Sequence, residues 1–330
     1  MNKRILITGI TGFVGSHLAE YCLKQGDRVC GTLISHHLGD ETKNIEHLLP
    51  KIDLRQCNLM NRSSVFRVLN EVRPDIIFHL AAHSFVPMSW KDPQEVLQNN
   101  IISELNIFET IRDLKLEDKT VIQIACSSEE YGLVKPEECP IKETQELRPM
   151  SPYAVSKVAQ EMLAKQYHYS YGLKTVITRA FNHEGARRGI DFVTSAFASQ
   201  LAKKINYREA IIKVGNLDAV RDFTDVRDMV TAYYMAVTSD RIKYGEPYNI
   251  CSGYGHKIQE VLDTLLTVLK TDSTVKITIE KDPKLNRPSD VPLLVGNCVK
   301  FKEATGWARE ITFEQMLIDI FDYWKEEYEV

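Results

Sequence analysis

Short apolar runs alternate with amphipathic stretches along the first half of the chain. The apolar runs stand at residues 4–9, 28–34, 54–59, 75–82, 120–128 and 174–182. Between them, the apolar residues have helical spacing at residues 15–26, 62–71, 93–113 and 152–171. Strands that alternate with helices form parallel sheets covered on both faces, and their crossovers are right-handed. The pattern therefore predicts an α/β fold with a doubly wound parallel sheet.

The regular alternation ends near residue 182. The later elements that we predict are a helix at 192–205, a short strand at 210–215, the entry of a helix at 221–237, a strand at 246–253 and an amphipathic helix at 313–328. The sequence has no linker rich in Ser, Gly or Pro between the halves. We therefore expect interwoven domains, a dinucleotide-binding domain from residues 1–182 and 219–252 and a smaller substrate domain from residues 183–218 and 253–330.

Composition narrows the class of protein. A hydrophobic fraction of 44% and a charged fraction of 26% are ordinary for a globular protein. The net charge of −4 gives no electrostatic reason to bind nucleic acid or an anionic membrane, and no apolar run approaches the ~20 residues of a membrane span. The seven cysteines are scattered without a CxxC pair, which favours reduced thiols over disulfides or zinc. We therefore expect a cytoplasmic protein without a metal.

A glycine motif follows the first apolar run. In GITGFVGSHLAE, Gly9 permits a tight turn, Gly12 lets the backbone approach a pyrophosphate, and Gly15 lets the following helix pack closely on the strand. The N–H groups and the dipole of that helix then favour phosphate. The motif predicts a dinucleotide cofactor, with further contacts from Thr11, Phe13 and Val14.

The residues after the next strands bear on which nicotinamide cofactor binds. The second run ends in ISHHLGD, with neither Asp nor Arg directly after it. Ser35, His36 and His37 suit the 2′-phosphate of NADP, so NADP is expected and NAD is the alternative. Residues at the ends of the third and fourth strands are expected to flank the adenine and the ribose, namely Asn58, Leu59, Leu80, Ala81 and Ala82.

Tyr153 and Lys157 form a YxxxK pair within SPYAVSKVAQEML. Four residues apart on a helix, the two side chains share a face. A nearby ammonium is expected to lower the pKa of Tyr153, which would then exchange a proton with a substrate hydroxyl.

The fifth apolar run ends in ACSSEEYG. Strand alternation predicts Ser127 and Glu129 on one face, and Ser128 and Glu130 on the other. With Tyr153 and Lys157 downstream, we expect Ser127 to hydrogen-bond the reacting substrate oxygen and Glu129 to transfer a proton.

The motifs together resemble the GDP-sugar branch of the extended short-chain dehydrogenases, whose nearest members are GDP-mannose 4,6-dehydratase and GDP-6-deoxy-4-keto-mannose reductase. They are GITGFVG, FHLAAHSFV, SSEEYG, SPYAVSK, RAFNHE, GNLDAVRDFTDVRD and RPSDVPLLVG, in this order along nearly the whole chain. The resemblance implies oxidation of the sugar C4 hydroxyl by a tightly bound NAD(P), loss of water across C5 and C6, and return of hydride to C6. Ser127, Glu129, Tyr153 and Lys157 match its catalytic residues.

The resemblance also implies roles for residues that the pattern alone does not single out. His183 and Arg188 would contact the cofactor, and Asn182, Arg221 and Arg287 the sugar diphosphate. Asp290 would meet the nucleotide ribose. The remaining substrate contacts that it implies are Ser84, Val86, Ser128, Val193, Thr194, Gly215 and Asn216.

Several alternatives stand beside the 4,6-dehydratase. The reductase carries SSEEYG as well, a nucleotide-sugar 4-epimerase shares the chemistry at C4, and a non-catalytic NAD(P)-sensing module shares the fold. The helices at 93–113 and 152–171 resemble those of the family's dimer interface. We therefore expect a homodimer, with a tetramer as the alternative, to which Leu105, Phe108, Met162 and Tyr167 contribute.

Overall fold

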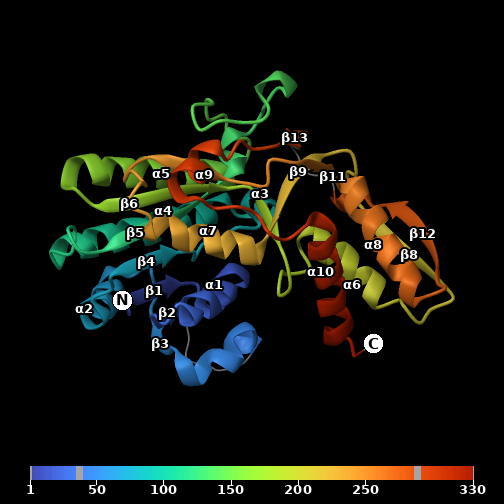
Figure 1. Cartoon of the computed structure of the whole chain (residues 1–330), viewed down its shortest axis with the longest axis horizontal. Coiled ribbons are helices and arrows are strands. Elements are labelled where there is room, and N and C mark those ends of the chain that lie inside the picture. Colours follow the sequence, from blue (N-terminus) through green and yellow to red (C-terminus); the bar gives the residue numbers. More distant parts are fainter. Residues whose placement is uncertain (1, 35–39, 286–290, 330) are drawn as a thin grey trace.

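The computed structural model describes residues 2–34, 40–285 and 291–329. Its main sheet consists of β1 (Arg4–Thr8), β2 (Arg28–Leu33), β3 (Asp53–Gln56), β4 (Ile76–His79), β5 (Val121–Ser127), β6 (Lys174–Ala180) and β10 (Pro247–Ile250). The strands lie in the order β10-β6-β5-β4-β1-β2-β3 and all pair in parallel (Figure 1). The predicted doubly wound sheet is confirmed.

Helices cover both faces of this sheet, as its apolar strands require. On one face lie α1 (Phe13–Lys24), the 3₁₀ helix η1 (Asp40–Lys51), α7 (Val226–Thr238) and α9 (Val299–Thr305). On the other lie α2 (Arg62–Val72), α4 (Pro93–Asp113) and α5 (Pro152–Tyr171). Alternation along β1 sends Ile5 and Ile7 to the first layer and Leu6 to the second. Full burial of each such side chain contributes about 1.5–3 kcal/mol.

Helix α5 begins and ends at defined caps. The Ser151 hydroxyl accepts a hydrogen bond from the Ala154 N–H at 3.1 Å, Pro152 occupies the first helical position, and Gly172 closes the helix with φ +74°. The caps fix the first two turns of α5, which carry Tyr153 and Lys157.

A second layered unit stands beside the carboxyl end of the main sheet. Its first sheet has β9 (Val220–Asp225) at the centre, paired with β7 (Asn182–Glu184), β11 (Gly255–Lys257) and β13 (Leu293–Leu294). Its second sheet pairs β8 (Glu209–Val214) with β12 (Lys276–Lys281). The helices α6 (Val193–Ala202), α8 (Ile258–Asp272) and α10 (Phe313–Glu327) lie beside these sheets (Figure 1), and they share one apolar core with them. Shorter elements are α3 (Val86–Lys91) and the 3₁₀ turns η2 (Ser128–Tyr131), η3 (Pro136–Glu138) and η4 (Pro283–Leu285).

The prediction of a helix that begins at residue 221 is wrong for its first residues. Residues Val220–Asp225 form β9, and α7 begins only at Val226. These residues form a strand because three neighbouring strands pair with it. The Asp225 side chain accepts a hydrogen bond from the Arg227 N–H at 2.8 Å and caps the helix that follows. The domain boundary expected at 219 thus falls just before a strand of the second unit. None of the helices in the described part of the chain combines the length and the apolar composition of a membrane span.

Candidate active site

The glycine motif forms a tight turn between β1 and α1. Gly9 has φ +69°, and the Gly12 N–H donates to the Gly9 carbonyl at 3.0 Å. A Cβ on Gly15 would lie 2.2 Å from the Gly9 oxygen, so only glycine permits this approach. Gly12 caps α1 without a side-chain hydrogen bond, which leaves the first N–H groups of the helix available to a phosphate.

The end of β4 is held close to this turn by Thr8. The Thr8 hydroxyl accepts from the backbone N–H groups of Leu80 and Ala81, both at 3.1 Å, and contacts His79 Nδ1 at 2.9 Å. Leu80 and Ala82 line the large cavity described below, as does Val14 from α1. Asn58 and Leu59 follow β3 at the same edge of the sheet, whereas Ser35, His36 and His37 lie outside the described residues. This edge fits a nicotinamide dinucleotide, since the glycines leave room for its phosphates and the small residues after β4 leave room for a ribose.

Tyr153 and Lys157 lie on the same face of α5 and line the cavity. The Lys157 ammonium stands 5.9 Å from the centre of the Tyr153 ring and donates to the Ala125 carbonyl at 2.8 Å. Burial raises the pKa of Tyr153, against a hydrogen bond from Ser127 that lowers it. Burial also lowers the pKa of Lys157. The expected depression of the tyrosine pKa is therefore wrong for this state of the chain, because desolvation of the phenolate is the largest effect.

Ser127 and Glu129 both line the cavity, but strand alternation does not place them there. β5 ends at Ser127, and residues Ser128–Tyr131 form the 3₁₀ turn η2. A capping box closes this turn: the Ser127 hydroxyl accepts from the Glu129 N–H at 3.2 Å, and the Glu130 carboxylate accepts from the Ser127 N–H at 2.8 Å. Glu129 is half-buried and faces the cavity, while Glu130 is fully buried beneath it.

Glu130 belongs to a buried charge cluster with Glu161 and Arg179. Arg179 lies 2.6 Å from Glu161 and 3.7 Å from Glu130. Cys126, Glu130 and Glu161 also have ligand atoms within 4.8 Å of one another. The guanidinium supplies the positive charge that these carboxylates need, and burial raises the pKa of the Cys126 thiol. The cluster therefore supports the η2 turn and is not built as a metal site.

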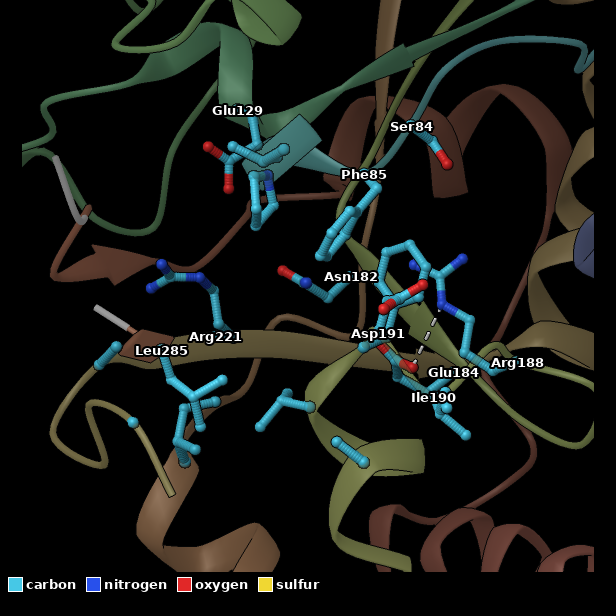
Figure 2. A pocket seen from close by; sticks show the side chains of 18 of the residues that line it. Ser84, Phe85, Glu129, Asn182, Glu184, Arg188, Ile190, Asp191, Arg221 and Leu285 are labelled. Carbon is cyan, nitrogen blue, oxygen red and sulfur yellow. Dashed lines mark ion pairs between the residues drawn. The ribbon is translucent and has the colours of Figure 1, made fainter. Parts of the chain in front are cut away.

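The cavity spans the space between the two units and has a volume of about 1560 Å³. Figure 2 shows Glu129, Asn182 and Arg221 around the same space, with Arg188 and Glu184 on the other side of Asn182. Arg221 is buried on β9 and donates to the Val220 carbonyl at 2.9 Å. Most of the predicted substrate residues line this cavity, namely Ser84, Val86, Ser128, Asn182, Val193, Gly215, Asn216 and Arg221. Arg287 and Asp290 lie outside the described residues.

His183 and Arg188 line the cavity next to α1. The His183 ring stacks on Phe13 with 6.2 Å between ring centres, and burial lowers its pKa to about 4, so it is neutral at physiological pH. The Arg188 guanidinium lies over the rings of Phe13 and Phe192, at 4.9 and 3.3 Å from their centres. Thr194 does not line the cavity: it is fully buried and its hydroxyl donates to Glu184 at 2.7 Å.

Several lining residues escaped the sequence interpretation. Glu184 is buried and lies 3.6 Å from Arg188, and Phe85 packs edge-on against Phe192. Four lysines from the second unit also line the cavity, namely Lys203, Lys213, Lys281 and Lys284. Phe85 and Glu184 stand inside the motifs FHLAAHSFV and RAFNHE, so they could have been found from the sequence. The lysines could not, because they come from separate elements that only the fold brings together.

The comparisons with known proteins agree on one family. The family model described as GDP-mannose 4,6 dehydratase matches residues 6–320. A GDP-mannose 4,6-dehydratase of Vibrio cholerae is 33% identical, over 97% of this chain and 93% of that protein. A GDP-6-deoxy-D-mannose reductase of Pseudomonas aeruginosa is 31% identical over 98% of both chains. Among solved structures, RMD from Pseudomonas aeruginosa complexed with NADPH is 28% identical, with a TM-score of 0.82 over 99% of this chain and 100% of that one.

Proposed function

Since this chain belongs to the GDP-mannose 4,6-dehydratase family, we propose that it is an NAD(P)-dependent dehydratase of a GDP-linked mannose-type sugar. The observation that carries the proposal is the geometry of one cavity. Ser127, Tyr153 and Lys157 line it together with Glu129, a carboxylate on the same side as the tyrosine. Oxidation at a sugar carbon needs the first three residues, and elimination of water from the neighbouring carbons needs the fourth.

The roles of the chain's own residues follow from this arrangement. When bound, the nicotinamide accepts a hydride from the sugar and later returns it. Tyr153 takes the proton of the C4 hydroxyl, and Ser127, which hydrogen-bonds to Tyr153, orients the same oxygen. Lys157 stabilises the charge that develops on the tyrosine. Glu129 removes the C5 proton, which the C4 ketone makes acidic, and the C6 hydroxyl takes up a proton and leaves as water. A proton is added back at C5 when the hydride is returned to C6.

The wall that the second unit contributes to the cavity suits a nucleoside diphosphate. Arg221 and Asn182 supply donors to the same space that Glu129 faces, and the four lysines add positive charge to the wall. Arginine meets a diphosphate through a planar fork of N–H groups, whereas the lysines act as point charges. A nucleotide sugar with its diphosphate on this wall would place its hexose against Tyr153 and Glu129.

The test is direct. The purified protein is incubated with GDP-mannose and NADP, and the product is identified by NMR and mass spectrometry. Loss of water and a ketone at C4 support the proposal. An unchanged sugar, under conditions where the cofactor is bound, contradicts it.

GDP-6-deoxy-4-keto-mannose reductase is the second candidate, because a reductase of Pseudomonas aeruginosa is 31% identical over 98% of this chain. The two activities differ in what happens to the cofactor. A dehydratase borrows and returns the hydride, so we expect no net consumption of the cofactor as product forms. Absorbance of reduced nicotinamide is followed beside product formation. Consumption of one NADPH for each 4-keto sugar lost would identify a reductase instead.

NADP is the cofactor that we infer, on the sequence ISHHLGD after β2, with NAD as the alternative. Structures of similar fold hold either one: the Pseudomonas aeruginosa RMD is complexed with NADPH, and a Thermus thermophilus UDP-glucose 4-epimerase, 28% identical, is in complex with NAD. Mass spectrometry of the nucleotide released from the denatured, freshly purified protein decides between them. The cytoplasm is the compartment that we infer, since all seven cysteines are free thiols.

We expect a homodimer that uses the outer face of α5. Val155, Met162 and Tyr169 recur every seven residues on this helix and are 45, 43 and 74% exposed, so they form one apolar stripe. Leu105 on the adjoining α4 is half-buried. Phe108 and Tyr167 do not belong to the stripe: both are buried, with ring centres 5.0 Å apart inside one chain, so their predicted place in the interface is wrong.

The oligomeric state is measured by light scattering at micromolar concentration. The parent protein should have the mass of a dimer, and Met162→Glu should have that of a monomer, because the charge would be buried in the interface. Phe66→Glu is the matched control, since Phe66 on α2 is apolar and 40% exposed. A monomeric parent, or a dimeric Met162→Glu, would contradict the expected interface.

A further inference from the structure

Residues 185–192, between β7 and α6, cross one face of α1 next to the glycine turn. The side chains that they meet are Phe13, Ser16, His17 and Glu20, which share a helix face at the N-terminal end of α1. His17 Nε2 donates to the Ala186 carbonyl at 3.0 Å. Arg188 covers Phe13 at 4.9 Å. The segment thus lies across the helix end where the glycine motif predicts the cofactor phosphates.

Arg187 fastens this segment to α1. Its guanidinium donates to the Glu20 carboxylate at 2.6 Å and to the Ser16 hydroxyl at 3.3 Å. Arg187 has φ +70°, a conformation that costs free energy for a residue with a side chain. Neither Arg187 nor Glu20 lines the large cavity, so the pair holds the segment from outside.

Glu20 also contacts η1, a second element next to the glycine turn. Its Oε1 atom lies 2.7 Å from His47 Nε2 on η1. From the same 3₁₀ helix, the Asn44 amide donates to the carbonyl of Thr11 in the glycine turn at 3.0 Å. One carboxylate therefore joins residues 185–192 to η1, and both elements flank the glycine turn.

The inner side of the segment faces the cavity. Arg188, Asp191 and Phe192 line it, and Arg188 and Asp191 are seen there in Figure 2. Arg188 Nε is buried and makes no hydrogen bond among the described residues, since Glu184 at 3.6 Å is too distant for one. A buried donor without a partner costs free energy, and an anionic group of a ligand in the cavity would satisfy it.

We propose that residues 185–192 form a strap that retains the nicotinamide cofactor, and that Glu20, through Arg187, is its latch. The inference rests on the proposed function only in requiring that a nicotinamide dinucleotide binds. Release of the cofactor requires the strap to leave α1, whereas catalysis with a returned hydride does not. Glu20 and Arg187 are positioning residues in this scheme, because they act through the strap and do not contact the sugar.

The test measures release of the cofactor without any sugar. The full-length protein is loaded with NADPH, and in a parallel sample with NADH, and freed of excess nucleotide. It is then chased with NADP or NAD while the fluorescence of the reduced nicotinamide is followed. Glu20→Gln and Arg187→Gln should each speed release roughly tenfold, the effect of losing one charge-assisted hydrogen bond that is absent from the opened state. The double variant should release no faster than either single one, because both remove the same latch.

Asp113→Asn is the matched control. It breaks an ion pair of 2.7 Å with Arg62 on the opposite face of the sheet and should leave release unchanged. At saturating cofactor and sugar, kcat of the latch variants should stay within about twofold of the parent. Parental release rates in both single variants would overturn the latch, as would additive effects in the double variant. If Glu20→Gln does not fold, Arg187→Gln decides alone, since Arg187 lies in the connection between β7 and α6 and not within a helix.

The two proposals fail separately. If the protein leaves GDP-mannose unchanged but both variants release NADPH faster than the parent, the strap is supported and the dehydratase activity is contradicted. If the protein dehydrates GDP-mannose but the parent and all variants release the cofactor at the same rate, the dehydratase activity is supported and the strap is contradicted.

Discussion

Replacement of Tyr153 by Phe should lower kcat about 10²–10⁴-fold, the usual cost of removing a general acid–base group. The phenolic oxygen is the part of Tyr153 that can take the proton from C4, and Ser127 hydrogen-bonds to it. The ring stays, so the packing at the start of α5 stays as well. Affinity for NADPH, measured by fluorescence titration, should change less than about threefold, which is under 1 kcal/mol.

Tyr167→Phe is the matched control for this substitution. Tyr167 lies on the same helix, outside the cavity, and its hydroxyl donates to Glu109 at 2.8 Å. Loss of this hydroxyl should lower the free energy of unfolding by about 1 kcal/mol and leave kcat unchanged. A Tyr153→Phe variant with more than a tenth of the parental kcat would refute the assignment of the tyrosine.

Glu129→Gln should separate oxidation of the sugar from elimination of water. Glutamine keeps the shape of the side chain and cannot take a proton from C5, whereas Ser127, Tyr153 and Lys157 still serve C4. The variant should bind GDP-mannose and build up absorbance of reduced nicotinamide on the enzyme. Formation of the dehydrated product should fall by about 10²-fold or more. In deuterated water, exchange at C5 should be as slow as elimination.

Glu130→Gln distinguishes the two neighbouring carboxylates. Glu130 is fully buried, accepts from the Ser127 N–H and pairs with Arg179, so its loss should destabilise the η2 turn. We expect a lower Tm and a lower rate of both half-reactions. If Glu129→Gln dehydrates normally and only Glu130→Gln stops at the reduced cofactor, the base is Glu130. If neither variant accumulates reduced cofactor, the reductase becomes the better explanation.

The main sheet could be predicted because its signal is local. Apolar runs such as ILIT and IIFH are buried on both faces, so the sequence carries them whatever their neighbours are. The second unit has no such signal. In RDFTDVRD the boundary between β9 and α7 depends on strands that come from residues 182–184, 255–257 and 293–294. Pairing with segments so distant in sequence leaves no periodicity to detect.

The site illustrates the same division. The spacing of Tyr153 and Lys157 was enough to place both on one helix face, and the glycine spacing was enough to describe the turn after β1. Strand alternation predicts the face on which Glu129 lies, but the η2 turn is what brings Glu129 to the cavity wall. The pKa of Tyr153 was also beyond the sequence, because burial, the largest effect on it, is set by elements from several parts of the chain.

The path of the chain between the two units restricts how substrate specificity can be exchanged between relatives. The core of the second unit draws on residues 197–223, 258–269 and 313–321, and the stretches between them return to the main sheet as α7, β10 and α9. No single contiguous segment of the chain therefore contains the whole second unit. A chimaera that takes its sugar pocket from another member must receive at least two separate stretches together, along with the side chains of α7 that pack between the units. Recombination at one junction should therefore give misfolded hybrids, and new specificities in this fold are more accessible through substitutions in the cavity wall.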